Sequence, residues 1–157
     1  MDESPEQPMV EVVLGRIVIR EGSDRQYIFL HERGGKRGFP IVIGSNEAAE
    51  IKRVIAQIEC ERPLTHQLAF SVIEAFGARI RRCDIVDLRQ NTFFAQLVLQ
   101  TEEGERTIVL DARPSDAIAL ALRAGCSLRV AESVLEQVRS DESGPDPLPG
   151  PGPQSPP

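Results

Sequence analysis

One stretch of this chain, residues 108–125, constrains its fold more than any other. Its first residues are β-branched and apolar, which predicts the end of a strand. Its second half is rich in Ala and Leu on every side, which predicts a buried helix. Pro114 suits the first helical position, where a missing N–H costs nothing, and Gly125 is placed to end the helix in the left-handed conformation. The stretch therefore predicts a strand that leads directly into a buried helix.

Two carboxylates, a guanidinium and a hydroxyl gather where this strand meets this helix: Asp111, Arg113, Ser115 and Asp116. One interpretation is structural: Asp116 caps the helix and complements its dipole, while Arg113 neutralises Asp111. The other is catalytic. Asp111 and Asp116 would hold a divalent cation such as Mg²⁺ or Mn²⁺, and Arg113 or the helix N-terminus would bind a phosphate group. The residues by themselves leave both interpretations open.

A second candidate site lies at His66, which follows Arg62 at the start of another predicted helix. A helix N-terminus lowers the pKa of a histidine, which favours a neutral imidazole that can act as a general base. A lone histidine at this position is also typical of a hydrogen-bonded surface residue. The sequence contains no Gly-rich phosphate loop, no nucleophile elbow and no metal-ligand spacing.

The remaining pattern predicts two runs of three strands separated by helices, followed by one short strand and a final helix. The strands are expected at residues 10–20, 26–31, 39–43, 78–88, 92–101, 106–111 and 127–130. A first helix is expected after Gly44, with Ser45 or Asn46 as N-cap, and a second one with Thr65 as N-cap. The predicted class is α+β, with mixed or antiparallel sheets built from the two three-stranded runs and helices packed against them.

Composition predicts a single domain over residues 9–139, with a disordered head at 1–8 and a disordered Pro/Gly-rich tail at 140–157. All 18 Lys and Arg residues lie in the domain, beside the same number of acidic residues, so the domain is formally neutral. A neutral domain is not a strong electrostatic attractant for nucleic acid. The 3 cysteines have no disulfide or zinc pattern, and no apolar run is long enough for a membrane span, so we expect a cytoplasmic protein without membrane contact.

Four ordered segments resemble the bifunctional nuclease domain family, which has bacterial and plant members. The segment Phe39-Pro-Ile-Val-Ile-Gly is similar to the family's Leu-Pro-Ile-(Trp/Val)-Ile-Gly. Arg62-Pro-Leu-Thr-His resembles Arg-Pro-Leu-Thr-His-Asp, and the residues from Asp87 to Ala95 resemble the family's Asp-Leu-x-(Asp/Asn)-(Gly/Asn)-Thr-Phe-Tyr-Ala hairpin. The fourth and most distinctive segment is Asp111-Ala-Arg-Pro-Ser-Asp-Ala-Ile. The resemblance covers residues 10–138 and departs from the family at Gln67, commonly Asp, and at Phe94, commonly Tyr.

The resemblance implies a nuclease that hydrolyses phosphodiester bonds in RNA, DNA or both, with nucleic acid as its partner. The implied site takes His66, Asp111 and Asp116 as catalytic residues, with Arg62, Arg113 and Ser115 on the substrate. Mg²⁺ or Mn²⁺ on Asp111 and Asp116 is the expected metal, and no organic cofactor is expected. The alternative is a non-catalytic binding or regulatory domain in which the segment beginning at Asp111 is a structural keystone. The apolar faces also predict a homo-oligomer.

Overall fold

The computed structural model describes residues 6–104 and 106–141, and it contains one mixed sheet with helices packed against it. The α+β class predicted from the sequence is confirmed. The strands are β1 (Met9–Val18), β2 (Arg25–Glu32), β3 (Gly38–Gly44), β4 (Ala78–Arg89), β5 (Thr92–Thr101), β6 (Thr107–Ala112) and β7 (Ser127–Ala131). The helices are α1 (Ser45–Ile55), α2 (Thr65–Ala75), α3 (Pro114–Ala124) and α4 (Glu132–Asp141).

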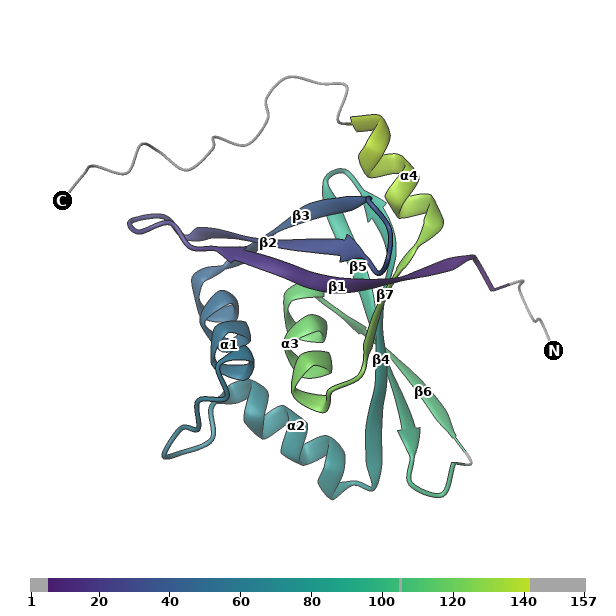
Figure 1. Cartoon of the computed structure of the whole chain (residues 1–157). Coiled ribbons are helices and arrows are strands. Elements are labelled where there is room, and N and C mark those ends of the chain that lie inside the picture. The colour runs from purple at the N-terminus through teal and green to yellow at the C-terminus, as the bar shows by residue number, and fades with distance from the viewer. Residues whose placement is uncertain (1–5, 105, 142–157) are drawn as a thin grey trace.

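The two predicted three-stranded runs join into a single seven-stranded sheet, in the order β3-β2-β1-β7-β4-β5-β6 (Figure 1). The short strand β7 makes the connection, since it pairs antiparallel with β1 on one side and parallel with β4 on the other. All other neighbours are antiparallel. Periodicity predicts both runs and the short strand, but it carries no information about which strands pair with β7.

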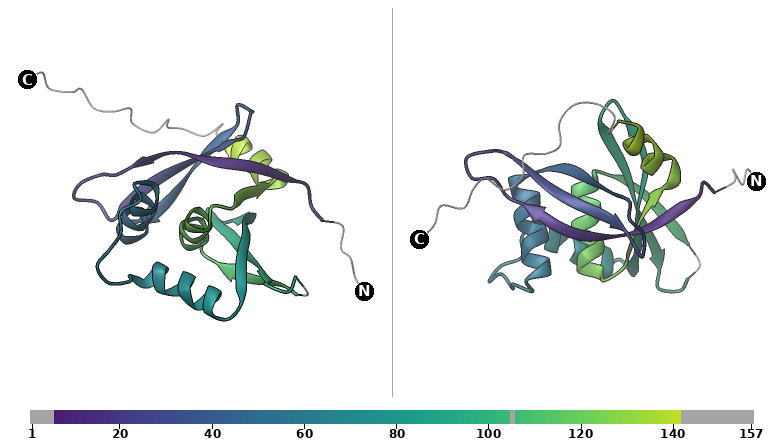
Figure 2. Two further views of the ribbon diagram at one scale, coloured as in Figure 1. Left: turned by 60° about the horizontal axis from the view of Figure 1, so that its bottom comes forward. Right: turned by 45° about the horizontal axis from the view of Figure 1, so that its top comes forward.

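The sheet curls, so that its two halves face each other across the core. Phe39 of β3 stacks on Phe93 of β5 with ring centroids 5.4 Å apart, although four other strands lie between them in the sheet order. Helix α3 lies in the angle between the two halves, and α1 and α2 flank it (Figures 1 and 2). Residues 117–121 of α3 are all buried, which agrees with their apolar character on every side.

The start and end of α3 agree with the prediction, whereas two other helix starts differ from it. Pro114 occupies the first turn of α3, and Gly125 ends the helix in the left-handed region with φ 68°. The N-cap of α1 is Gly44 rather than Ser45 or Asn46, and the N-cap of α2 is Leu64 rather than Thr65.

At the start of α2, a side chain inside the helix accepts the hydrogen bond of the N-cap backbone N–H. The side-chain oxygen of Gln67 accepts a hydrogen bond from the Leu64 backbone N–H at 2.8 Å. Gln67 therefore closes the helix start from its third residue, and Thr65, predicted as the cap, is simply the first residue of the helix.

The predictions for residues 1–5 of the head and 142–157 of the tail lie outside the described residues. Within the described part, none of the helices is long and apolar enough to cross a bilayer.

Candidate functional site

A hydrogen bond joins the N-terminal turns of α2 and α3. The Nε2 atom of His66 lies 2.8 Å from Oδ1 of Asp116, and the other carboxylate oxygen of Asp116 accepts a hydrogen bond from Nε of Arg113, also at 2.8 Å. Arg113 is the N-cap residue of α3, and Asp116 lies in its first turn. Two of the predicted site segments, which are far apart in the sequence, therefore meet at one carboxylate.

Arg113 extends this cluster to a third helix. Its Nη2 atom lies 3.0 Å from Oε1 of Glu47, which lies in the first turn of α1. The His–Asp–Arg–Glu cluster, defined as His66, Asp116, Arg113 and Glu47, thus ties together the N-terminal turns of α1, α2 and α3. Carboxylates are favourable at these positions because each helix N-terminus carries a partial positive charge.

The cluster is partly open to solvent. The side chains of His66 and Glu47 are 19% and 17% exposed, Asp116 is 29% exposed and the Arg113 side chain is 67% exposed. Burial raises the pKa of Asp116, but the hydrogen bonds from Arg113 and His66 outweigh it and hold the pKa below its usual value. Asp116 is therefore ionised at neutral pH. Because the Arg113 side chain is mostly exposed, a solvent molecule or a substrate can reach its guanidinium group.

An ionised Asp116 also decides which nitrogen of the histidine is free. A carboxylate only accepts hydrogen bonds, so a neutral His66 must donate its Nε2–H to Asp116. The lone pair then lies on Nδ1, which is the ring nitrogen placed to accept a proton. This is the His–Asp arrangement of a general base.

The other predicted site residues do not join the cluster. Asp111 lies on the edge strand β6 opposite Gln96 of β5, is exposed, and forms no hydrogen bond or ion pair with the described residues. Arg62 is exposed on the connector before α2 and is likewise unpaired within the described ranges. Ser115 is 7% exposed, and its hydroxyl has no hydrogen-bond partner in the described part of the chain. Arg113 pairs with Asp116 and Glu47, not with Asp111 as the structural interpretation predicted.

The described residues show no preformed metal site. Among residues 6–104 and 106–141 there is no group of three His, Cys, Asp or Glu side chains placed to hold a metal ion, and both oxygens of Asp116 already accept hydrogen bonds. A cation of the Mg²⁺ type keeps several waters and binds through one or two carboxylates together with substrate phosphates, so it needs fewer protein ligands than such a group provides. The assignment of Asp111 and Asp116 as metal ligands stays a prediction.

Sequence reasoning missed Glu47 as a member of the cluster. The available signal was its place in the first turn of the helix that follows the Phe39-Pro-Ile-Val-Ile-Gly segment. Nothing in the sequence connects that turn to Arg113, which lies 66 residues away.

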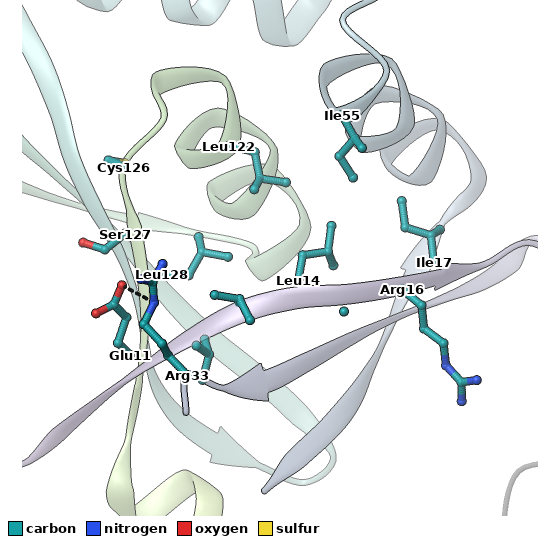
Figure 3. Close-up of a pocket in the computed structure, with 13 residues that line it drawn as sticks. Glu11, Leu14, Arg16, Ile17, Arg33, Ile55, Leu122, Cys126, Ser127 and Leu128 are labelled. Carbon is teal, nitrogen blue, oxygen red and sulfur yellow. Dashed lines mark ion pairs between the residues drawn. The ribbon is translucent and has the colours of Figure 1, made fainter. Parts of the chain in front are cut away.

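A separate cleft of about 590 Å³ lies between β1 and the helices α1 and α3. In Figure 3, Leu14 and Ile17 of β1 point toward Ile55 of α1 and Leu122 of α3, and an ion pair between Glu11 and Arg33 lies at its edge. None of the residues of the His–Asp–Arg–Glu cluster lines this cleft. Its lining is mostly apolar, and Arg33, one of its two arginines, is paired with Glu11, so the cluster is the better candidate for the predicted chemistry.

Comparison with known proteins connects this geometry to a family. A family model described as the Bifunctional nuclease domain matches residues 28–143. A relative from Mycobacterium tuberculosis H37Rv, which carries the name Uncharacterized protein Rv1829, is 40% identical over 129 residues, 82% of this chain and 76% of its own. Bifunctional nuclease 2 of Oryza sativa subsp. japonica is 26% identical over 132 residues, 82% of this chain and 40% of the rice protein. Bifunctional nuclease 1 of Arabidopsis thaliana is 24% identical over 115 residues, 71% of this chain and 35% of its own.

The fold and the cluster define an α+β domain that exposes a His–Asp pair where three helix N-termini meet. The chain belongs to the bifunctional nuclease domain family, because the family model covers most of the described residues. It spans less than half the length of the two plant nucleases.

Proposed function

We propose that this protein is a nuclease that hydrolyses phosphodiester bonds at the His–Asp–Arg–Glu cluster. The observation that carries the proposal is the 2.8 Å hydrogen bond between His66 Nε2 and Asp116 Oδ1, which leaves Nδ1 as the free basic nitrogen. The family relationship supports the reaction class, since the two plant relatives are named bifunctional nucleases. RNA and DNA are both proposed as substrates.

In the proposed reaction, Nδ1 of His66 takes a proton from a water molecule whose oxygen attacks phosphorus. The bond between phosphorus and the leaving ester oxygen breaks, and the imidazolium returns the proton to that oxygen. Asp116 keeps the imidazole in the required tautomer and stabilises its protonated form. Arg113, whose side chain is 67% exposed, stabilises the negative charge that develops on the non-bridging phosphate oxygens.

Charge around the cluster favours a metal-assisted version of this reaction. With His66 neutral, the two carboxylates of Asp116 and Glu47 outweigh the single guanidinium of Arg113, so the cluster does not attract a phosphate by itself. Mg²⁺ or Mn²⁺ bound with the substrate would neutralise the phosphate charge. Asp111 and Asp116 are the proposed carboxylates for the cation, and Arg62 and Ser115 are proposed substrate contacts. A cytoplasmic location is part of the same proposal.

The same contacts favour a second candidate function, a non-catalytic domain in which the cluster is a structural keystone. Arg113 bridges Asp116 and Glu47, and these bonds fix α1 against α3 whatever the chemistry. Under this alternative, the wild-type protein does not cleave nucleic acid with or without a metal ion. The variants His66→Ala and Asp116→Asn are then less stable than the wild type but differ from it in no cleavage activity.

The test is cleavage of labelled single-stranded RNA and DNA by the purified full chain, with EDTA and with added Mg²⁺ or Mn²⁺. The variants are His66→Ala and Asp116→Asn. His31→Ala is the matched control, because His31 is the other histidine and lies exposed on β2. We expect at least a 100-fold loss of cleavage in the first two variants and none in the control. Equal cleavage by all of them would identify a contaminating nuclease and overturn the proposal.

A further inference from the structure

One side of α2 carries an apolar stripe that the rest of the described chain leaves uncovered. Its members follow each other at intervals of four residues, and their exposed fractions are high: Leu64 39%, Leu68 57%, Val72 47% and Phe76 87%. Sequence periodicity alone would place such a stripe against the core. Instead, the neighbouring residues Ala69, Phe70 and Ile73 pack against the core. The helix therefore uses one apolar side for folding and presents another to solvent.

Exposure of this kind requires an explanation because large exposed apolar patches are rare on monomers. Phe76 alone exposes most of a side chain that typically buries about 150–250 Å². The four side chains together expose on the order of 400 Å², which is as large as the largest apolar patch of a typical monomer. The largest apolar patch of a monomer is often a functional surface, so this one is a candidate interaction site.

We propose that the α2 stripe, defined as Leu64, Leu68, Val72 and Phe76, is the contact surface between two copies of this chain. Two facing stripes bury on the order of 800 Å² of apolar surface, and the flanking residues of two crossed helices add to it, which approaches the roughly 1,200 Å² of a small stable interface. A symmetric dimer brings each patch against its own copy, so a charged patch would repel itself. Glu74 is the single Asp, Glu, Lys or Arg residue of α2, so little charge opposes self-contact.

The spacing of the stripe also specifies how the two helices meet. Residues four apart form one of the ridges on a helix surface, and two identical ridges interlock when the helices cross at about −50°.

A nucleic acid is a poor occupant of the α2 stripe, because the stripe offers no cation for its phosphates. The same stripe on a second copy of the chain is equally apolar and has the same four-residue spacing, so the two stripes can pack against each other.

The test is sedimentation equilibrium of the full chain over a wide concentration range. We expect a species of about twice 17.3 kDa for the wild type. Leu68→Arg and Phe76→Glu should weaken the dimer at least 100-fold while leaving the circular dichroism spectrum unchanged, because both side chains are more than half exposed. Val42→Glu is the matched control: Val42 is 52% exposed on the edge strand β3, away from α2, and its substitution should leave the dimer intact.

Hydrogen exchange of the wild type provides a second readout that needs no variant. Dilution below the dissociation constant should accelerate amide exchange in α2 specifically. A wild type that stays monomeric at high concentration overturns the proposal, even if another protein binds the stripe. The proposal is also overturned if the dimer persists in both Leu68→Arg and Phe76→Glu and if dilution of the wild type does not accelerate amide exchange in α2.

Discussion

The imidazole of His66 and the carboxylate of Asp116 form a 2.8 Å hydrogen bond between two helices, although the residues are 50 positions apart in the sequence. The same carboxylate holds Arg113, and Arg113 holds Glu47. Four polar side chains therefore link three helix starts. Catalysis and folding make different demands on this group, and the following substitutions separate the two.

Replacing Asp116 with Asn should remove the charge that balances Arg113, and it should weaken the hydrogen bonds to His66 of α2 and to Arg113 at the N-cap of α3. Hydrogen bonds to charged groups contribute about 1.5–3 kcal/mol when well formed, and partial exposure reduces this, so we expect a stability loss of about 1–2 kcal/mol. Urea unfolding measures it. A Glu47→Gln variant serves as a comparison because it weakens only the bond to Arg113. If the Asp116→Asn protein is as stable as the wild type, Asp116 does not contribute to the stability of the fold.

Replacing Gln67 with Ala should weaken the start of α2, because the Leu64 N–H loses its side-chain acceptor. Loss of a helix cap costs about 0.5–2 kcal/mol, and the measurement is the thermal midpoint. Gln67→Glu keeps an acceptor at the same reach and should retain stability. If Gln67→Ala and Gln67→Glu melt alike, the hydrogen bond contributes nothing measurable.

Stability should fall as the medium is acidified below the normal range of carboxyl groups. Burial raises the pKa values of Asp84 and Asp116, but hydrogen bonds from arginines, and from His66 in the case of Asp116, outweigh it and leave both values lowered. A lowered folded-state pKa adds stability above the unfolded value of about 3.9, and this stability is lost as the pH falls through the folded value. Urea midpoints between pH 6 and pH 2 test this loss.

Asp84 offers a control for the acid response, since it binds Arg82 and Arg129 on the sheet, outside the cluster. Asp84→Asn should flatten the fall in stability at low pH without affecting cleavage. A steep acid response that persists unchanged in both Asp84→Asn and Asp116→Asn would show that other carboxylates control it.

The three cysteines should differ sharply in their reaction with a thiol reagent at pH 8. Cys83 is fully buried in the core, and burial, together with the nearby Asp84 and Cys126, raises the pKa of its thiol to about 12. It should therefore react only when the protein unfolds, whereas Cys60 on the connector after α1 should react first. Mass spectrometry of the labelled peptides distinguishes them. Rapid labelling of Cys83 in the folded protein would contradict its burial in the core.

Local signals predicted most of the secondary structure because they act within a few residues. The apolar run of α3, Pro114 at its start and Gly125 at its end specified that helix without reference to the rest of the chain. The hairpin between β4 and β5 is equally local, since Gln90 and Asn91 take the positive φ angles of 49° and 60° that a tight turn requires. The N-caps Gly44 and Leu64 lie one or two residues before the predicted ones, because the nearby Ser, Thr and Asn side chains do not cap these helices.

The amino-acid sequence by itself determined the α+β class, the strand and helix order and the family, since periodicity, turn residues and motifs are local properties. Only the tertiary structure decided which polar residues meet. It brought His66, Asp116, Arg113 and Glu47 together, left Asp111 on an edge strand, and turned the stripe of Leu68, Val72 and Phe76 toward solvent. These outcomes depend on how the two halves of the sheet curl around α3, and contacts between residues distant in sequence leave no local pattern from which to predict them.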